Sequence, residues 1–352
     1  MPAKLAWTKT GDVVGMTYYS MCPLAILRPM KILIELPSWL GDAVMATPAL
    51  ENLFNRWPKA EITVTGSALA VEALRAHPRI TRCITDRTKE GGWRPLRVYR
   101  LARELGPHDL AISFRSHLYS RLLLAWTGSA KRFLYRRIDS AAPAGESPHQ
   151  VRRYVEFVNA LSGSDDPAGP LRLDWPAHKY ERPTLGINPG ASYGSAKRWY
   201  PEKFAELGAK LASRFDLVIF GGPGEVEIAA DIEKALRRKG VENLNNLAGR
   251  TRIPELCSAI GGLDLFVTGD SGPMHIAAAY RIPTVAIFGP TKWWETSQWK
   301  NPYGRIVRHD LDCAPCMKRN CPLKHHECMR GIGSEEVLAT IEELLQSKEF
   351  DS

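Results

Sequence analysis

The sequence predicts an α/β protein of two Rossmann-like, doubly wound domains that face each other across a central cleft. The chain has 352 residues, a length that favours two domains of roughly 100–200 residues each. From residue 30 onward, short β-branched runs alternate with amphipathic stretches, which is the pattern of parallel strands joined by helices. This pattern stops at residues 162–170 and then starts again, so we interpret that stretch as the linker.

The first half, residues 30–175, is predicted to form the N-terminal domain. Its apolar runs predict strands at 32–36, 61–65, 83–85 and 110–114, and helical spacing predicts helices at 42–56, 68–76 and 150–161. The preceding residues 1–29 contain one apolar run, interrupted by Pro23, that is too short to span a bilayer. We expect them to be a loosely ordered extension and Met30 to be the native start; an arm packed on the domain is the alternative.

The second half, residues 176–333, is predicted to form the C-terminal domain, followed by a C-terminal helix and tail at 334–352. We expect strands at 184–187, 216–220, 243–247, 263–268 and 284–288, and helices at 201–214, 225–239, 254–261 and 272–280. Ligands of such sheets bind beyond the carboxyl ends of the strands. Functional groups are therefore expected in the loops that follow these strands.

Composition and charge exclude several classes of protein. The chain is 44% hydrophobic and 24% charged, which excludes disordered, collagen-like and coiled-coil proteins. Seven cysteines without a visible secretory signal favour a reducing cytosol. The 47 Lys and Arg against 38 Asp and Glu give a net charge of +9, which suits nucleic acid, an anionic membrane surface or an acidic substrate. Charge alone does not choose among these partners.

The loop after the first strand places a carboxylate, Asp42, at the start of a helix. It lacks Gly-x-Gly-x-x-Gly spacing, so it does not support a dinucleotide cofactor. The neighbouring Gly41 allows another molecule to approach Asp42 closely. The alternative is an acidic residue that is favoured there only by the helix dipole.

Two loops of the second half, residues 188–199 and residues 268–279, are suited to holding phosphate, and a turn between them is suited to holding ribose. Residues 188–199 are rich in small residues that expose backbone N–H groups, and they bring the positive charges of Lys197 and Arg198. This is not a Walker loop, and a mobile basic surface loop is the alternative. The glycine-rich turn at 220–225 ends in Glu225, whose carboxylate can accept hydrogen bonds from ribose hydroxyls.

The other loop, residues 268–279, joins a buried strand to a helix. Its polar turn, the first turn of the helix and a nearby imidazole together suit a diphosphate. Simple helix capping by the same side chains is compatible with this role. The residues concerned are Asp270, Ser271, Gly272 and His275.

Four cysteines lie within sixteen positions near the C-terminus and open with a Cys-x-x-Cys pair. Four thiols can close a tetrahedral zinc site, although this spacing is not that of a standard zinc finger. An iron–sulfur cluster, a disulfide pair and plain reduced thiols are the alternatives, and His325 or His326 can replace one thiol. The four are Cys313, Cys316, Cys321 and Cys328.

Four segments in order resemble the bacterial heptosyltransferases of glycosyltransferase family 9. They are ILIELPSWLGDAVMATPAL at 32–50, INPGASYGSAKRWYPEKFAELGAKL at 187–211, VIFGGPGEVE at 218–227 and FVTGDSGPMHIAAAYRIPTVAIFGPT at 266–291. The resemblance implies a GT-B fold and inverting transfer of L-glycero-D-manno-heptose from ADP-heptose to the inner core of lipopolysaccharide. It also implies a cytoplasmic protein, peripheral at the cytoplasmic face of the inner membrane.

The same resemblance implies roles for individual residues. Asp42 falls on the family's proposed catalytic base, which accepts the proton of the acceptor hydroxyl. No cofactor is expected for the chemistry, and the cysteine cluster is interpreted as a structural zinc site outside catalysis. The donor contacts fall on Lys197, Glu225, Asp270, Ser271, Gly272, Met274 and His275.

The acceptor is expected to meet the arginine-rich first half of the chain. Inner-core lipopolysaccharide carries anionic sugar acids, so basic side chains there are electrostatically favourable. Arg115 and His117 follow the strand at 110–114 and are the predicted acceptor-binding residues. A solvated helix face is the alternative for several of the other arginines.

Two rival functions stay open at this point. One is another nucleotide-sugar enzyme of the same architecture, either a transferase acting on a different surface glycan or an epimerase. The other is a basic nucleic-acid-binding protein, which requires aromatic side chains interleaved on a basic face. The tryptophans instead cluster near the predicted donor loops, so we expect no nucleic-acid partner. These are Trp199, Trp293, Trp294 and Trp299.

Overall fold

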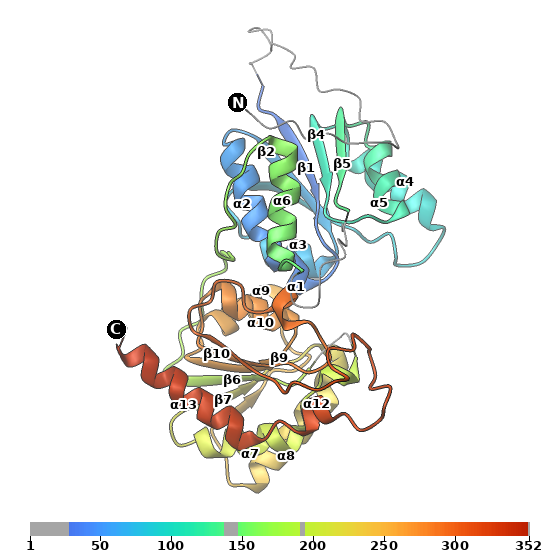
Figure 1. Ribbon diagram of the computed structural model, residues 1–352. Coiled ribbons are helices and arrows are strands. Elements are labelled where there is room, and N and C mark those ends of the chain that lie inside the picture. Colours follow the sequence, from blue (N-terminus) through green and yellow to red (C-terminus); the bar gives the residue numbers. More distant parts are fainter. Residues whose placement is uncertain (1–27, 137–146, 191–193, 351–352) are drawn as a thin grey trace.

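The computed structural model describes residues 28–136, 147–190 and 194–350, with side chains up to residue 347. The predicted extension at 1–29 lies outside these residues except for its last two positions. The protein has two parallel β-sheets, each in its own domain and each covered by helices (Figure 1). The predicted fold class is confirmed.

The N-terminal sheet has five parallel strands in the order β3-β2-β1-β4-β5. Four of them were predicted to within a few residues. The fifth, β5, was missed because its side chains are largely exposed at the sheet edge and show no apolar pattern. The strands are β1 (Lys31–Glu35), β2 (Glu61–Gly66), β3 (Ile80–Thr85), β4 (Leu110–Ser113) and β5 (Lys131–Leu134).

The C-terminal sheet has six parallel strands in the order β11-β10-β9-β6-β7-β8. Its centre, β9 and β6, is completely buried, as expected for strands covered by helices on both faces. The edge strand β11 was not predicted. The strands are β6 (Thr184–Asn188), β7 (Asp216–Ile219), β8 (Leu244–Asn246), β9 (Leu265–Gly269), β10 (Thr284–Ile287) and β11 (Gly304–Val307).

The prediction of one helix at 42–56 is wrong in one respect, because the structure has two helices that are separated at Ala46. Pro48 lies in the first turn of the second helix and has no N–H to continue the hydrogen-bond ladder. The helices of the N-terminal domain are α1 (Leu40–Met45), α2 (Thr47–Arg56), α3 (Ala68–Leu74), α4 (Arg94–Leu105), α5 (Leu118–Trp126) and α6 (Gln150–Ser162). Those of the C-terminal domain are α7 (Pro201–Leu211), α8 (Val226–Arg238), α9 (Ile253–Gly261), α10 (Gly272–Ala279), α11 (Trp293–Thr296), α12 (Glu327–Arg330) and α13 (Ser334–Phe350).

The two domains meet through two pairs of helices. Helix α1 packs on α10, and α3 packs on α9. A Cβ atom at Gly41 would lie 2.8 Å from Cδ2 of His275, so only glycine permits this approach. The carboxyl ends of β1 and β9 are thereby brought together.

In the part of the chain that the structure describes, no helix combines the length and apolar character needed to cross a bilayer.

Candidate active site

The start of α1 places Asp42 beside the C-terminal domain. Asp42 lies in the first turn of this short helix, where the exposed N–H groups favour a carboxylate. Gly41 packs directly on His275 of α10. The backbone of the next residue, Asp42, therefore lies close to the first turns of α10. The structure therefore brings Asp42 and the predicted diphosphate loop together across the domain boundary.

A buried tyrosine holds the Asp42 carboxylate. The Tyr154 hydroxyl, from α6, donates a hydrogen bond to Asp42, and burial together with the negative charge of Asp42 raises the pKa of Tyr154 well above its usual value. The phenol therefore stays protonated and remains a donor. Its ring is fixed edge-on against Phe114 and Tyr135. Tyr154 has no signal in the sequence that points to this role, because only the tertiary packing of α6 on α1 brings it to Asp42.

The loop after β9 is tied to Lys197 by a buried ion pair. The Lys197 ammonium lies 2.6 Å from Oδ2 of Asp270, and the Thr291 hydroxyl donates to the same oxygen at 2.7 Å. Lys197 also donates to the Asp270 carbonyl at 3.3 Å. Two predicted donor residues thus contact each other directly.

The amino end of α10 is lined by polar groups with unused hydrogen-bonding capacity. Ser271 accepts a hydrogen bond from the Asn188 side chain at 3.2 Å, while Oδ1 of Asn188 is buried and has no partner among the described residues. Nδ1 of His275 is likewise buried without a partner there, and burial lowers the pKa of His275 to about 4. His275 is therefore neutral at physiological pH. The Met274 side chain instead packs into the core with Phe288, so only its backbone belongs to this loop.

The turn after β7 brings Glu225 against the loop after β6. The Glu225 carboxylate accepts a hydrogen bond from the Gly222 N–H at 2.7 Å. It fills the space above Gly190, where an added Cβ would lie 2.0 Å from Cδ of Glu225. Glu225, Lys197 and Asp270 therefore follow neighbouring strands of the sheet, β7, β6 and β9.

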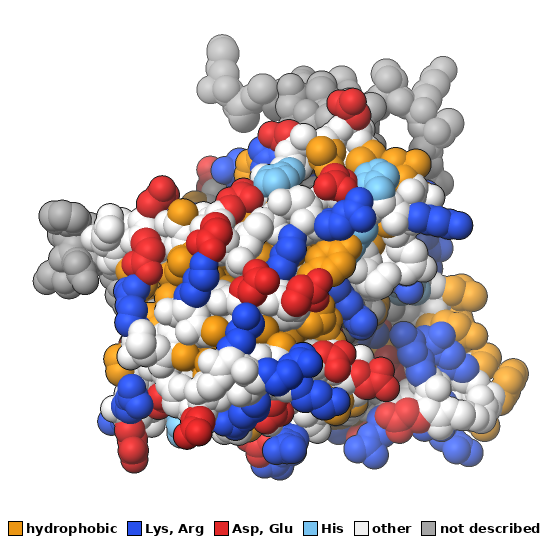
Figure 2. Space-filling view, turned by 90° about the horizontal axis from the view of Figure 1, so that it is seen from below, with side chains coloured by type: hydrophobic (Ala, Val, Ile, Leu, Met, Phe, Trp, Pro, Cys, Tyr) orange, Lys and Arg blue, Asp and Glu red, His pale blue; other side chains and the backbone are white. Residues whose placement is uncertain are grey.

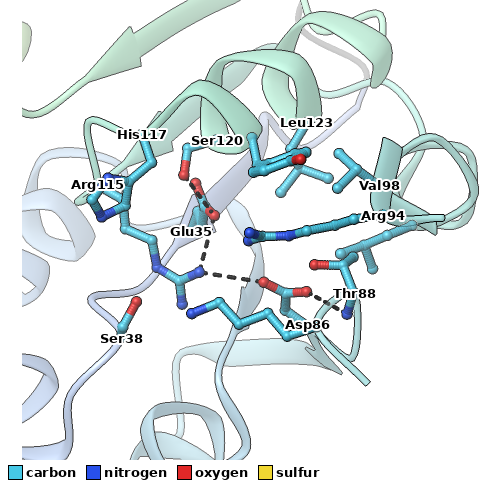
Figure 3. A pocket seen from close by; sticks show the side chains of 13 residues that line it. Glu35, Ser38, Asp86, Thr88, Arg94, Val98, Arg115, His117, Ser120 and Leu123 are labelled. Carbon is cyan, nitrogen blue, oxygen red and sulfur yellow. Dashed lines mark hydrogen bonds and ion pairs between the residues drawn. The ribbon is translucent and has the colours of Figure 1, made fainter. Parts of the chain in front are cut away.

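A polar pocket lies at the carboxyl end of the N-terminal sheet (Figure 3). At its base Arg115 donates to the buried Glu35 at 3.2 Å and to Asp86 at 3.3 Å. Burial raises the pKa of Glu35 despite the Arg115 charge, whereas hydrogen bonds from Thr88 and the Arg115 charge outweigh burial and lower the pKa of Asp86. Glu35 was not singled out from the sequence, although a carboxylate at the end of an apolar strand was a signal for it.

The same pocket retains donors that its own carboxylates do not use. Nη2 of Arg115 and Nε of Arg94 are buried without a partner among the described residues. The Arg94 guanidinium lies over the Tyr119 ring, 3.8 Å from its centroid. His117 is exposed at the start of α5 and lines the pocket, as does Ser38 from the loop before Asp42. The structure thus places both predicted acceptor residues at this pocket. Most of the Arg115 guanidinium, however, already donates hydrogen bonds to protein groups.

The beginning of α6 and the residues just before it join the two domains. Arg153 forms a buried ion pair with Glu295 at 3.4 Å, and Ser147 donates to Glu295 at 2.6 Å. His149 bonds the Ser297 carbonyl at 3.0 Å, and burial lowers the pKa of His149 to about 4. These contacts hold the Tyr154 helix against the C-terminal domain.

The described residues on the underside of the C-terminal domain form no extended patch of one charge (Figure 2). Figure 2 shows basic and acidic side chains interspersed over this face. Exposed ion pairs join α7 and the residues just after it to α13, such as Arg214 with Glu342 at 2.6 Å. Exposed pairs of this kind contribute little to stability and mark a solvated surface.

The four clustered cysteines lie outside these pockets. Cys328 is buried, and burial together with the nearby Cys316, Cys313 and Cys321 raises its pKa to about 11. As placed, the described His, Cys, Asp and Glu side chains form no group of three or more that holds a metal ion. Trp199, expected near the donor loops, lies in the domain core and donates to the Ile332 carbonyl at 3.0 Å.

Comparisons with known proteins cover nearly the whole chain. Residues 98–327 match the model of glycosyltransferase family 9 (heptosyltransferase). A lipooligosaccharide heptosyltransferase 2 of Campylobacter jejuni is 37% identical over 331 residues, covering 90% of this chain and 99% of the relative. The lipopolysaccharide heptosyltransferase 2 of Escherichia coli is 27% identical and covers 91% of this chain and 100% of the relative. The solved structure of E. coli ADP-heptose lipopolysaccharide heptosyltransferase II aligns with a TM-score of 0.75 and 26% identity, covering 91% of this chain and 100% of the other.

Proposed function

This chain belongs to glycosyltransferase family 9, the heptosyltransferases, and we propose that it transfers L-glycero-D-manno-heptose from ADP-heptose to the inner core of lipopolysaccharide or lipooligosaccharide with inversion. One observation carries the proposal. Helix α1 packs on α10, so that Asp42 lies beside the loop suited to the donor diphosphate.

In this proposal Asp42 is the general base. It accepts the proton of the acceptor hydroxyl as that oxygen attacks the anomeric carbon of heptose from the face opposite the diphosphate. The Tyr154 hydrogen bond fixes the carboxylate in one orientation. Tyr154 therefore acts as a positioning residue, because it acts through Asp42.

The C-terminal domain is proposed to stabilise the departing ADP. The positive charge of Lys197 and the N–H groups at the start of α10 face negative charge that develops on the diphosphate oxygens. His275 is neutral, so its unused ring nitrogen supplies a hydrogen bond without charge. Glu225, one strand further along, is placed to accept hydrogen bonds from the ribose.

The pocket of the N-terminal domain is proposed to hold an anionic sugar of the acceptor. Nε of Arg94 and Nη2 of Arg115 are buried and have no partner among the described residues, a state that an acidic group would relieve. Ser38 lines the same pocket four residues before Asp42. A sugar acid held here would therefore present a neighbouring sugar hydroxyl to the base.

The exposed apolar side chains around this pocket favour contact with a membrane surface. Trp93, just before α4, is 71% exposed, and Leu118, at the start of the adjoining helix α5, is 64% exposed. The basic residues Arg100 and Arg103 are exposed on the same α4 helix. Aromatic and basic side chains together suit the headgroup region of an anionic leaflet. We therefore propose that the enzyme binds peripherally to the cytoplasmic face of the inner membrane.

Transfer to acceptors of defined length tests the proposed function. We expect the purified chain to release ADP from ADP-heptose in the presence of an inner-core acceptor that ends in one heptose, and to extend it by one heptose. Pelleting with anionic but not neutral vesicles is expected alongside. Transfer from UDP- or GDP-sugars in preference to ADP-heptose would instead support another nucleotide-sugar enzyme of this architecture.

The cysteine cluster is proposed to hold a structural zinc ion away from the chemistry. Cys313, Cys316 and Cys321 lie within electrostatic reach of Cys328, and four thiols are a donor set that zinc binds in structural sites. Elemental analysis after anaerobic purification is expected to give one zinc per chain, and less in the Cys316→Ser variant. A metal-free, folded and active wild-type protein would exclude the zinc site.

A further inference from the structure

A second cavity, of about 310 Å³, lies at the carboxyl end of the C-terminal sheet, beside the proposed donor site. It is bordered by the segments that follow β10 and β11. Its walls combine two indole rings with basic, acidic and hydroxyl side chains. The residues that matter here are Thr291, Trp293, Trp294, Arg308 and Asp310.

The cavity begins next to the predicted diphosphate site. Thr291, in its wall, donates to the same Asp270 oxygen that Lys197 contacts, so one carboxylate separates the cavity from the predicted phosphate-binding charge. In the sheet, β10 lies next to β9 on the side away from β6 and β7. A donor with its ribose at Glu225 and its diphosphate at α10 therefore directs its sugar toward β10 and β11.

The spacing of the strands matches the length of one sugar. Neighbouring strands lie about 4.8 Å apart, so β10 and β11 are one and two steps of that size beyond the α10 loop. The anomeric carbon of the donor is bonded to the diphosphate and must lie near Asp42. The exocyclic two-carbon arm extends from C5, which is joined to the anomeric carbon through the ring oxygen, and it is the part of the sugar that we assign to the cavity.

The chemistry of the walls suits a sugar. Arg308 lies over the Trp293 ring, 5.0 Å from its centroid, and pairs with Asp310. An indole face packs against the C–H groups of a saccharide, while a guanidinium and a carboxylate bond its hydroxyls in fixed directions. Pockets with this mixture of apolar walls and few convergent polar groups are typical of small-ligand sites.

The cavity is also connected to the base through the N-terminal domain. The Trp294 indole N–H donates to the Ser147 hydroxyl at 3.0 Å. Ser147 lies just before α6, and Tyr154 follows about 6 Å along that helix from its first residue, Gln150. The cavity wall and the residue that positions Asp42 are therefore parts of one connected segment.

We propose that this cavity binds the exocyclic, two-carbon arm of the donor heptose and so selects an ADP-heptose over an ADP-hexose. This inference rests on the proposed function and names the part of the protein that reads the sugar. A site built to hydrogen-bond a hydroxyl discriminates strongly against the analogue that lacks it, because its own polar groups are left unpaired.

The test compares Arg308→Ala and Arg308→Lys with Arg305→Ala as the matched control. Arg305 lies on β11 but bonds backbone carbonyls and Ser347 and does not line the cavity. We expect Arg308→Ala to raise the KM for ADP-heptose about tenfold or more. The ratio of kcat/KM for ADP-heptose to kcat/KM for ADP-mannose is expected to fall. The Kd for ADP alone, measured by calorimetry, is expected to stay within about twofold, which also shows that the variant is folded. The KM of Arg308→Lys for ADP-heptose is expected to lie between those of the wild type and Arg308→Ala. The KM of Arg305→Ala is expected to equal that of the wild type.

Three results would overturn the inference. An Arg308→Ala enzyme with unchanged KM and donor preference excludes the cavity from donor recognition. A rise confined to the KM for the acceptor assigns the cavity to the acceptor saccharide instead. A wild-type enzyme that is inactive with ADP-heptose but active with another nucleotide sugar removes the proposed function, and this inference with it.

Discussion

Asp42→Asn is expected to lower the turnover number about 10³-fold while ADP binding changes less than about twofold. The amide keeps the size and planar shape of the carboxylate but cannot accept a proton at neutral pH. Because Asp42 lies on α1 and the donor groups lie on the C-terminal domain, the substitution leaves Lys197, Asp270 and α10 in place. Single-turnover transfer and calorimetric ADP binding on the same sample measure both expectations.

A Tyr154→Phe variant separates the base from the residue that positions it. Removal of one hydroxyl is expected to lower kcat about tenfold with little change in the acceptor KM. The acidic limb of the pH profile should move to higher pH, because a carboxylate that loses a hydrogen-bond donor holds its proton more tightly. Tyr180→Phe is the control, since it removes a hydroxyl that donates to the Ala259 carbonyl at 3.1 Å. Full activity of Asp42→Asn would exclude the base role, whatever the Tyr154 variant does.

The loops around Asp42 were predictable because they obey local rules. A carboxylate in a first turn, a neighbouring glycine and a loop after a buried strand are all visible in the sequence. The sequence does not show what the glycine is for. In the structure Gly41 admits His275 of the other domain, and a contact across 234 positions has no local signature.

Other parts of the molecule around the site were not predicted from the sequence. The arginine-rich first half was expected to meet the acceptor, with a solvated helix face as the alternative for several arginines, and no helix was predicted at 94–105. Val98, Leu101, Ala102 and Leu105 nevertheless have the spacing of a buried helical face there. Tyr154 and Glu295 carry no such signal, because their importance depends on how α6 packs between the domains.

Arg115→Met is expected to destabilise the protein by about 3–5 kcal/mol, the usual consequence of removing one partner of a buried ion pair. Glu35 is 2% exposed and would keep only the hydroxyls of Ser113 and Ser120 as partners. Burial already raises the pKa of Glu35 above its value in an unfolded chain. The folded state therefore binds this proton more tightly, and stability is lost as the pH rises above about 4.5. Urea unfolding of the variant at pH 5 and pH 7.5 should show a larger loss at the higher pH.

The stability of Arg115→Met also distinguishes two roles for Arg115: neutralising the buried Glu35, or contacting the anionic acceptor. If Arg115 chiefly neutralises Glu35, then adding Glu35→Gln to Arg115→Met removes the buried charge and recovers most of the lost stability. Arg94→Ala should behave in the opposite way, with nearly wild-type stability and a raised acceptor KM, because Arg94 has no carboxylate partner among the described side chains. A stable Arg115→Met enzyme with a raised acceptor KM would instead make Arg115 the acceptor contact that its position in the sequence suggested. The pocket would then bind its anion with the whole guanidinium, and Glu35 would be neutral in the folded protein.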